Sequence, residues 1–184
     1  MAAGHVRYST TGGAGLRNVQ PLFADLARGG FSIAHNGNIS NAMHLKQDLV
    51  NKGAIFQSTS DTEVIIHLIA RSRRQSIVER VVDALREVEG AWSLVAVFDG
   101  GILGGRDPLG VRPLVLGLLD GAWIMASESC ALDILGAEFV RDVEPGEIVV
   151  IDGAGVRSLR PFAPQPRRFC IFEYVYFARP DSII

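Results

Sequence analysis

The stretch FSIAHNGNISN, residues 31–41, decides how the rest of the chain is interpreted. Its first half alternates apolar with small or polar residues, which predicts a half-buried strand. We expect the strand to break at residues 35–38, because Gly37 tolerates positive φ and close approach by other groups. The Asn36 side-chain amide and the Gly37 N–H would then be two donors at the end of a rigid strand, the composition of an oxyanion hole. A polar hairpin turn is the alternative, since Asn-Gly is a strong turn signal.

Length and composition indicate one globular domain. The chain has 184 residues, of which 48% are hydrophobic and 21% charged, and its formal net charge is −2. This balance excludes a disordered chain and favours neither a nucleic acid nor a membrane as partner. No apolar run is long enough to span a bilayer. Cys130 and Cys170 do not make a disulfide framework, and the first residues do not resemble a signal peptide, so we expect a cytoplasmic location.

Three helices are predicted in the first half of the chain. One covers residues 43–51, with Gly53 as its stop signal. Two more follow capping boxes, in which a serine precedes a glutamate by three residues: Ser60 with Glu63, and Ser76 with Glu79. Apolar residues at helical spacing give each of these two helices a buried face. The expected buried residues are Val64, Ile65, Leu68 and Ile69 in the first, and Val78, Val81, Val82 and Leu85 in the second.

The second half of the chain reads as short strands. Asp120-Gly121 predicts a hairpin turn, and Pro145-Gly146 is expected to join two paired strands. Helices in the centre with meandering strands around them predict an α+β fold. The predicted strands are residues 91–99, 102–106, 114–119, 122–126, 138–143 and 147–151, with a helical turn at 129–135.

Two charged residues are candidates for ligand binding. The guanidinium of Arg7 could grip a carboxylate through paired hydrogen bonds. The carboxylate of Asp61 could hold an ammonium group, so the pair would suit the head group of an amino acid. The structural alternatives are an ordinary ion pair for Arg7 and a favourable charge at a helix start for Asp61. The sequence offers no metal-ligand spacing between its histidines and cysteines.

Seven motifs, in order, resemble the glutaminase domain of the amidophosphoribosyltransferase family. The first three also resemble sister class-II amidotransferases such as glucosamine-phosphate synthase. The last is specific to the amidophosphoribosyltransferase family, which carries out the first step of purine synthesis. The motifs are GHVRYSTTG (4–12), AHNGNISN (34–41), STSDTEV (58–64), GRDPLGVRPL (105–114), ASESCALD (126–133), VEPGEIVVI (143–151) and CIFEYVYFARPDSI (170–183).

The resemblance implies an N-terminal-nucleophile fold, a four-layer αββα sandwich with antiparallel sheets. It implies that Arg7 binds the glutamine carboxylate, that Asp61 binds its amino group, and that Tyr8 and Thr10 line the pocket. Asn36 and the Gly37 N–H would form the oxyanion hole. Residues 1–160 would be the glutaminase domain without its N-terminal strand, and residues 161–184 a linker into a phosphoribosyltransferase domain.

The family's nucleophile is a cysteine on that N-terminal strand, and neither cysteine of this sequence lies near the start. We therefore expect these residues alone not to hydrolyse glutamine. No cofactor is expected here, although the full-length family uses Mg²⁺ and some members bind a 4Fe–4S cluster through a cysteine that Cys170 resembles. Glutamine is the expected ligand; phosphoribosyl pyrophosphate would bind the other domain, and the full-length family forms homo-oligomers.

Two further hypotheses stay open beside the enzyme fragment. One is a catalytically silent module that binds glutamine or docks a separate transferase. The other is a hydrolase that uses Ser9 or Thr10 with His5, although the resemblance places these hydroxyl groups in the lining of the pocket.

Overall fold

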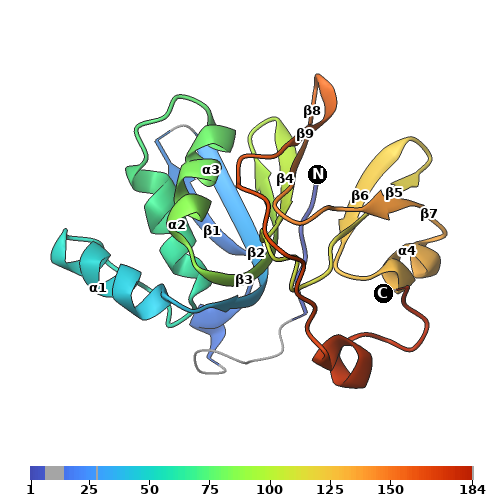
Figure 1. Cartoon of the computed structure of the whole chain (residues 1–184). Coiled ribbons are helices and arrows are strands. Elements are labelled where there is room, and N and C mark those ends of the chain that lie inside the picture. Colours follow the sequence, from blue (N-terminus) through green and yellow to red (C-terminus); the bar gives the residue numbers. More distant parts are fainter. Residues whose placement is uncertain (7–14, 28, 184) are drawn as a thin grey trace.

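The structure is a computed structural model that describes residues 1–6, 15–27 and 29–183 (Figure 1). The elements follow one another along the chain as η1 (Leu16–Asn18), β1 (Leu22–Leu26), β2 (Gly29–Ile39), α1 (Ala42–Asn51), α2 (Thr62–Arg71), α3 (Ile77–Glu87), β3 (Gly90–Phe98), β4 (Gly101–Arg106), β5 (Val115–Leu119), β6 (Ala122–Ala126), α4 (Ser129–Leu135), β7 (Glu138–Asp142), β8 (Ile148–Asp152), β9 (Gly155–Leu159) and η2 (Glu173–Phe177).

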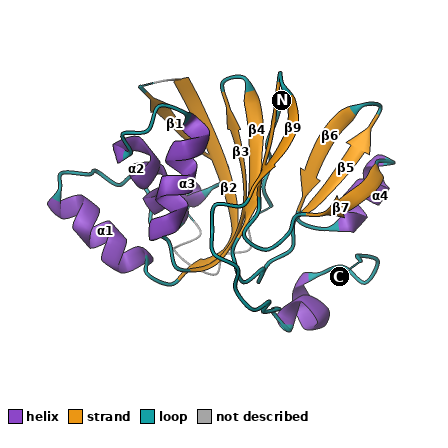
Figure 2. Ribbon diagram, turned by 45° about the horizontal axis from the view of Figure 1, so that its top comes forward, coloured by secondary structure: helices purple, strands orange, loops and turns teal. Residues whose placement is uncertain are grey.

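Two antiparallel sheets form the centre of the molecule. The larger sheet has the strand order β1-β2-β3-β4-β8-β9 and the smaller has the order β6-β5-β7. In Figures 1 and 2, α2 and α3 lie against one side of the larger sheet, the smaller sheet lies on its other side, and α4 lies beyond the smaller sheet. The predicted α+β class with antiparallel sheets is therefore confirmed.

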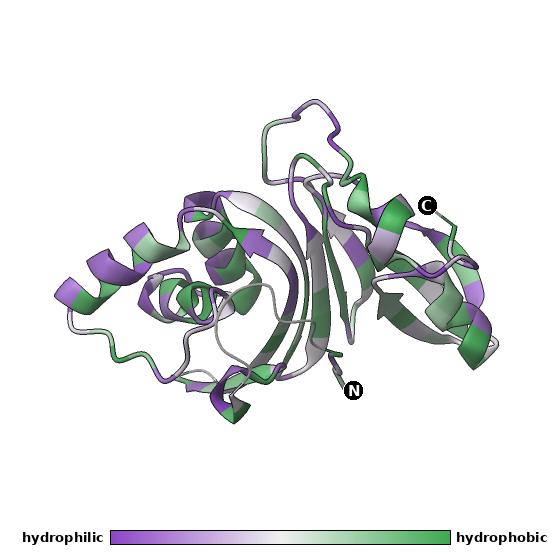
Figure 3. Ribbon diagram, turned by 90° about the horizontal axis from the view of Figure 1, so that it is seen from below, coloured by the Kyte–Doolittle hydropathy of each residue, from purple (hydrophilic) through white to green (hydrophobic). Residues whose placement is uncertain are grey.

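Alternation along the strands of the larger sheet divides its side chains between two apolar clusters. Ile148 and Val150 of β8 pack with the helices α2 and α3, whereas Val149, between them, packs with Leu114 and Leu116 toward the smaller sheet. Because successive side chains of a strand point to opposite faces, a sheet that is covered on both faces becomes a nearly continuous apolar run. This is why VVI in residues 149–151 has no polar residue. In Figure 3 the projecting helix α1 carries many hydrophilic residues.

The predicted strand break at residues 35–38 is wrong, and so is the alternative of a hairpin turn. Strand β2 continues to Ile39, and Gly37 pairs with Trp92 of β3. Gly37 has φ 148°, and a Cβ added to it would lie 2.1 Å from the Ala91 carbonyl oxygen. Glycine is therefore required for close approach of two strands and not for a turn.

The helix predictions are confirmed in position, but one of the two capping boxes is wrong. Ser76 and Glu79 form theirs at the start of α3. At the start of α2, the Glu63 carboxylate instead accepts hydrogen bonds from the Gln57 and Ser58 N–H groups and from the Ser58 hydroxyl. The buried faces are as predicted: Val64, Ile65, Leu68 and Ile69 in α2, and Val78, Val81, Val82 and Leu85 in α3.

The predicted pairing across Pro145-Gly146 is also wrong. Strand β7 pairs with β5 in the smaller sheet, whereas β8 pairs with β4 and β9 in the larger one. Residues 143–147 carry the chain from one sheet to the other, where the sequence predicted a hairpin. The turn at Asp120-Gly121 is confirmed, with positive φ at both residues. Strands β1 and β9 were not predicted.

Candidate functional site

A cavity of about 560 Å³ brings distant parts of the sequence together beside β2. Three of the predicted site residues, Asn36, Gly37 and Asp61, line it. Arg7, Tyr8 and Thr10 lie outside the described residues, as do Ser9 and the rest of the segment 7–14. The described residues before that segment do reach the cavity, and Figure 3 shows the N-terminal end beside the two sheets. The further lining residues are Gly4, His5, Val6, Gln20, His35, Ser60, Arg112, Pro113, Ile124, Met125, Ala126, Ser127, Glu128, Ala131, Leu135, Glu173 and Phe177.

The edge of β2 directs a backbone donor toward this cavity. His35 N–H donates to Gln20 Oε1 at 2.7 Å, and Ile39 N–H donates to Asp61 Oδ2 at 3.0 Å. In an antiparallel strand the N–H groups of every second residue point to the same edge. The Gly37 N–H lies midway between these two residues in the sequence, so it points to the same edge, between Gln20 and Asp61. The Gly37 donor that the sequence expected at a turn therefore lies in an unbroken strand.

Asp61 places a carboxylate at the same edge. Its side chain is 9% exposed, and one oxygen accepts from the Ile39 N–H while the other lies 3.9 Å from His35 Nδ1. The residue comes directly before α2, which begins at Thr62. The hydrogen bond from Ile39 holds the carboxylate in place, and its other oxygen lies at the wall of the cavity. Such a carboxylate is suited to hold an ammonium group.

His35 lies directly behind this edge and is buried. Its Nδ1 is 3.2 Å from the Thr62 hydroxyl, and its Nε2 is 3.4 Å from the Ala91 carbonyl oxygen. Burial lowers the pKa of His35 below its ordinary value, although the neighbouring Asp61 carboxylate acts in the opposite direction. The imidazole is therefore neutral near pH 7, with one nitrogen as donor and the other as acceptor.

Another wall of the cavity comes from residues that sequence reasoning did not select. Arg112 forms an ion pair with the buried Glu173, and its guanidinium lies over the Phe177 ring, 4.1 Å from the ring centre. Arg112 follows β4 and the other two belong to η2, so 61 positions separate the paired charges. Both residues of the ion pair lie in motifs that resemble the family, but no rule of sequence spacing relates the two motifs. Only their occurrence together in one family could have indicated that they meet in the fold.

The segment after η2 is attached beside the same wall. The Glu128 carboxylate accepts hydrogen bonds from the Arg179 N–H at 2.9 Å and from the Ser182 hydroxyl at 2.7 Å. The Ile183 N–H donates to the Ser129 hydroxyl at 2.7 Å. The division of the chain near residue 160 stays a prediction, and these contacts place part of the predicted linker at the cavity.

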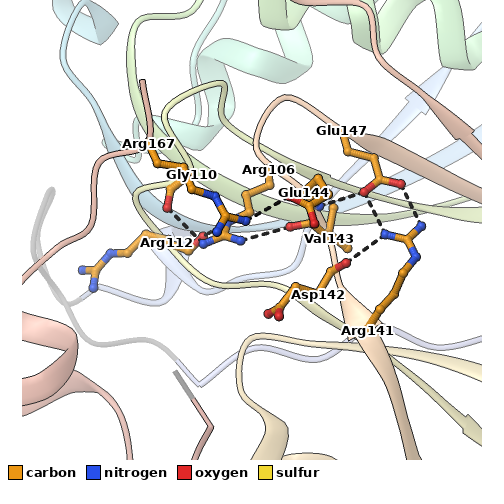
Figure 4. A network of polar contacts seen from close by, with 9 residues as sticks. All are labelled: Arg106, Gly110, Arg112, Arg141, Asp142, Val143, Glu144, Glu147 and Arg167. Carbon is orange, nitrogen blue, oxygen red and sulfur yellow. Dashed lines mark hydrogen bonds and ion pairs between the residues drawn. The ribbon is translucent and has the colours of Figure 1, made fainter. Parts of the chain in front are cut away.

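A network of polar contacts surrounds the turn that leads to Arg112 (Figure 4). The Arg106 guanidinium donates to three backbone carbonyls, those of Arg112 at 2.7 Å and of Val143 and Gly110 at 3.0 Å. Burial lowers the pKa of Arg106, and the nearby Asp142 and Asp107 carboxylates oppose that effect. These bonds fix the turn that carries Arg112 to the cavity.

Asp107 and Glu147 complete the scaffold around this turn. Asp107 is buried and accepts from the backbone N–H groups of Trp92, Leu109 and Val111. Burial would raise the pKa of Glu147, but hydrogen bonds from Arg141, from the Ser158 hydroxyl and from the Glu144 N–H outweigh it and lower this pKa to about 2. Arg141 lies in β7 and Glu147 precedes β8, so the pair ties the two sheets together where the chain crosses between them.

The described residues do not support a metal centre. Among them, no group of three histidine, cysteine, aspartate or glutamate side chains is arranged to hold an ion. Cys130 is buried and Cys170 is half-buried, and both are free thiols. Cys170 alone does not make the four-cysteine set of a cluster. Within the described parts of the chain, no helix has the length and apolar character needed to cross a membrane.

Comparison with known proteins identifies the class of this domain. A family model described as "Glutamine amidotransferase domain" matches residues 5–133. Amidophosphoribosyltransferase from Rhizobium etli is 54% identical over 189 residues, which cover 100% of this chain and 38% of that protein. The amidophosphoribosyltransferase of Bacillus subtilis is 45% identical, and the match covers 100% of this chain and 39% of the relative.

A solved structure agrees with these sequence matches. It is glutamine phosphoribosylpyrophosphate amidotransferase from B. subtilis complexed with ADP and GMP, with a TM-score of 0.92 and 43% identity. The match covers 98% of this chain and 39% of that one. The chain thus belongs to the glutamine amidotransferase domain family. Within that family it is similar to the class-II domain of the amidophosphoribosyltransferases. The chain spans 38–39% of the length of these relatives.

Proposed function

We propose that this chain is the glutamine-binding part of an amidophosphoribosyltransferase, in a fold of the N-terminal-nucleophile type with αββα layers. In that role glutamine and water would give glutamate and ammonia. The ammonia would displace pyrophosphate from phosphoribosyl pyrophosphate and so form 5-phosphoribosylamine, a step of purine synthesis. The observation that carries the proposal is the edge of β2, where the Gly37 N–H points between Gln20 and Asp61.

Each end of a glutamine molecule has a suitable partner in the proposed site. The Asp61 carboxylate holds the α-ammonium group. The Asn36 amide and the Gly37 N–H receive the negative charge that develops on the side-chain carbonyl oxygen when it is attacked. Arg7 binds the α-carboxylate, and Tyr8 and Thr10 line the pocket; these three roles follow from the family resemblance.

The proposed site residues do not include a nucleophile. Neither cysteine is among the described residues that line the cavity. We propose that a segment outside residues 1–184 supplies the family's cysteine, and that phosphoribosyl pyrophosphate and its Mg²⁺ bind outside this chain as well. The homo-oligomer of the family, a cytoplasmic location and a cluster ligand role for Cys170 stay predictions of the same kind.

Binding measurements test the proposal without requiring turnover. We expect calorimetry to show weak binding of glutamine and weaker binding of glutamate, because Asn36 and the nearby backbone match an amide better than a second carboxylate. Asp61→Asn should weaken glutamine binding by about tenfold or more, the range for a hydrogen bond to a charged group. The variant keeps an oxygen for the Ile39 N–H, so the strand edge is preserved.

Asp48→Asn is the matched control, because Asp48 is a partly exposed α1 residue that does not line the cavity. It should leave the affinity unchanged. Equal affinity for glutamine and glutamate, or equal effects of the two substitutions, would contradict the proposed site. Glutamine binding without ammonia release in a protein that includes the family cysteine would favour the silent binding module.

A further inference from the structure

The edge of β2 is supported by a buried side chain that has no place in the proposed chemistry. The His35 imidazole is 1% exposed and lies below Gly37, since a Cβ added to Gly37 would come within 2.8 Å of His35 Nε2. Its neighbours come from two other elements, Thr62 of α2 and Ala91 of β3. The ring therefore fills the space behind the backbone donor and joins the strand to both elements.

The partners of the ring determine where its proton lies. The Ala91 carbonyl oxygen is an acceptor and never a donor, so Nε2 carries the hydrogen. Nδ1 is then an acceptor, and the Thr62 hydroxyl donates to it. In this state nothing on the ring bonds to Asp61 Oδ1, which lies 3.9 Å from Nδ1. Among the described residues, that oxygen stays available at the cavity wall.

We propose that neutral His35 is a positioning residue that keeps the Gly37 N–H directed at the cavity and leaves the Asp61 carboxylate to the ammonium group of the ligand. The inference rests on the proposed function and deepens it. His35 does not touch the ligand in this account; it acts through Gly37 and Asp61.

Protonation of His35 would weaken both effects, although the Nε2–H bond to Ala91 would remain. A second ring hydrogen at Nδ1 repels the hydrogen of the Thr62 hydroxyl and is attracted to the Asp61 carboxylate. The protonated ring then competes with the ammonium group of the ligand for that carboxylate. The charged groups that face the ring are Asp61, which favours protonation, and His5 and Arg112, which oppose it together with burial. The pKa of His35 is lowered, so the neutral form prevails near pH 7 and competition begins on the acid side.

Two ligands separate the two effects. Glutamine has an α-ammonium group, whereas 5-amino-5-oxopentanoate is the same molecule without it. We expect glutamine affinity to fall by about tenfold as the ring protonates, since one hydrogen bond to a charged group is lost. The affinity of 5-amino-5-oxopentanoate should fall less, because it makes no use of Asp61.

Three variants complete the design. His35→Gln supplies an amide donor near the Nε2 position and cannot protonate, so it should bind glutamine within about threefold of the wild type and lack the acid decline. His35→Leu removes the donor and should weaken both ligands at every pH. His5→Gln is the control for the other histidine at the cavity and should keep the acid decline.

Nitrogen-15 NMR of the imidazole provides a measurement that does not depend on binding or on His35→Leu folding. We expect the neutral Nε2–H form at pH 7.5. A ring that is protonated or carries its hydrogen on Nδ1 at that pH would overturn the inference, as would identical pH profiles for wild type and His35→Gln. Failure of the wild type to bind glutamine at pH 7.5 would instead overturn the proposed function.

Discussion

The strand edge around Gly37 and the buried turn around Arg106 are both dense in polar groups, yet they use them differently. At the turn, every guanidinium nitrogen of Arg106 donates to a backbone carbonyl, and the Asp107 carboxylate accepts from three backbone N–H groups. At the strand edge, bonds from His35 and Ile39 flank a Gly37 N–H that points to the cavity. The polar groups of the turn bond to one another, whereas the strand edge presents a backbone N–H to the cavity.

This difference separates binding from scaffold within a single set of motifs. The AHNGNISN and GRDPLGVRPL stretches both belong to motifs that resemble the family, and the residue types of a motif do not show whether its polar groups bond within the fold. The direction of the donors does. Substitutions at the turn should therefore act on the free energy of unfolding, whereas substitutions at the edge should act on ligand affinity.

The largest expected effect is that of Arg106→Met. The substitution keeps the volume of the side chain but leaves the three carbonyls without their donor and the Asp107 and Asp142 charges less balanced. Breaking a buried charged network of this kind costs about 3–5 kcal/mol. Chemical denaturation should show a correspondingly lower free energy of unfolding.

The matched control is Arg157→Met on β9. Arg157 forms an ion pair with Asp152 and is about half exposed. An exposed pair contributes about 0–1 kcal/mol, so this variant should unfold close to the wild type. If the two variants lost similar free energies of unfolding, the turn around Arg106 would contribute no more to stability than the Arg157–Asp152 ion pair on β9.

Glu147 gives the scaffold a dependence on pH. Its pKa is about 2 in the folded protein, below its ordinary value of 4.5. A carboxyl group with a depressed folded pKa contributes stability above its unfolded pKa and loses it as pH falls through the folded one. The contribution is at most about 3 kcal/mol and is lost between about pH 4.5 and pH 2. Unfolding free energies measured across that range should fall less steeply in Glu147→Gln.

Glu144→Gln serves as the comparison for this slope. Glu144 carries an exposed ion pair with Arg167 in the same crossing segment. Its removal should leave the acid dependence nearly unchanged. If the free energy of unfolding fell with pH as steeply in Glu147→Gln as in the wild type, Glu147 would not contribute to the stability of the scaffold.

Gly37→Ala tests the strand edge in both readouts. The new Cβ would meet the Ala91 carbonyl oxygen at 2.1 Å, at a φ of 148° that side chains rarely adopt. Strained backbone costs about 1–3 kcal/mol, and the Gly37 N–H would turn away from the cavity. Glutamine binding should fall below detection while far-UV circular dichroism is retained. Gly153→Ala, in an open hairpin turn, is the control and should change neither.

How much of this was predictable differs between elements. The helices, their buried faces and the α+β class follow from periodicity and from one capping box. The break at His35 was wrong because Asn-Gly is a local turn signal, and pairing with β3 over nine residues overrides it. The crossing at residues 143–147 was wrong for a similar reason: a Pro-Gly pair indicates a turn but not which sheet receives the next strand. Asn36, Gly37 and Asp61 were predicted as site residues and line one cavity, and their roles stay a prediction. Glu173 could not be predicted, because its place at the cavity depends on contact with Arg112.

The smallest effect concerns that contact and tests whether the tail belongs to the ligand site. Glu173 neutralises Arg112 at the wall of the cavity. In Glu173→Gln the Arg112 charge would lose this partner and attract a ligand carboxylate, so glutamate should gain affinity relative to glutamine by several-fold, about 1 kcal/mol or less.

Asp181→Asn gives the control, because it removes an exposed carboxylate of the same tail that pairs with Arg179 away from the cavity. Calorimetric titration of both amino acids into each variant measures the preference directly. A preference that changes in Glu173→Gln and not in Asp181→Asn would assign the tail to the binding region of the molecule. An unchanged preference would assign the Arg112–Glu173 pair to the scaffold, beside Arg106, and would show that a charge at a cavity wall is not by itself a ligand contact.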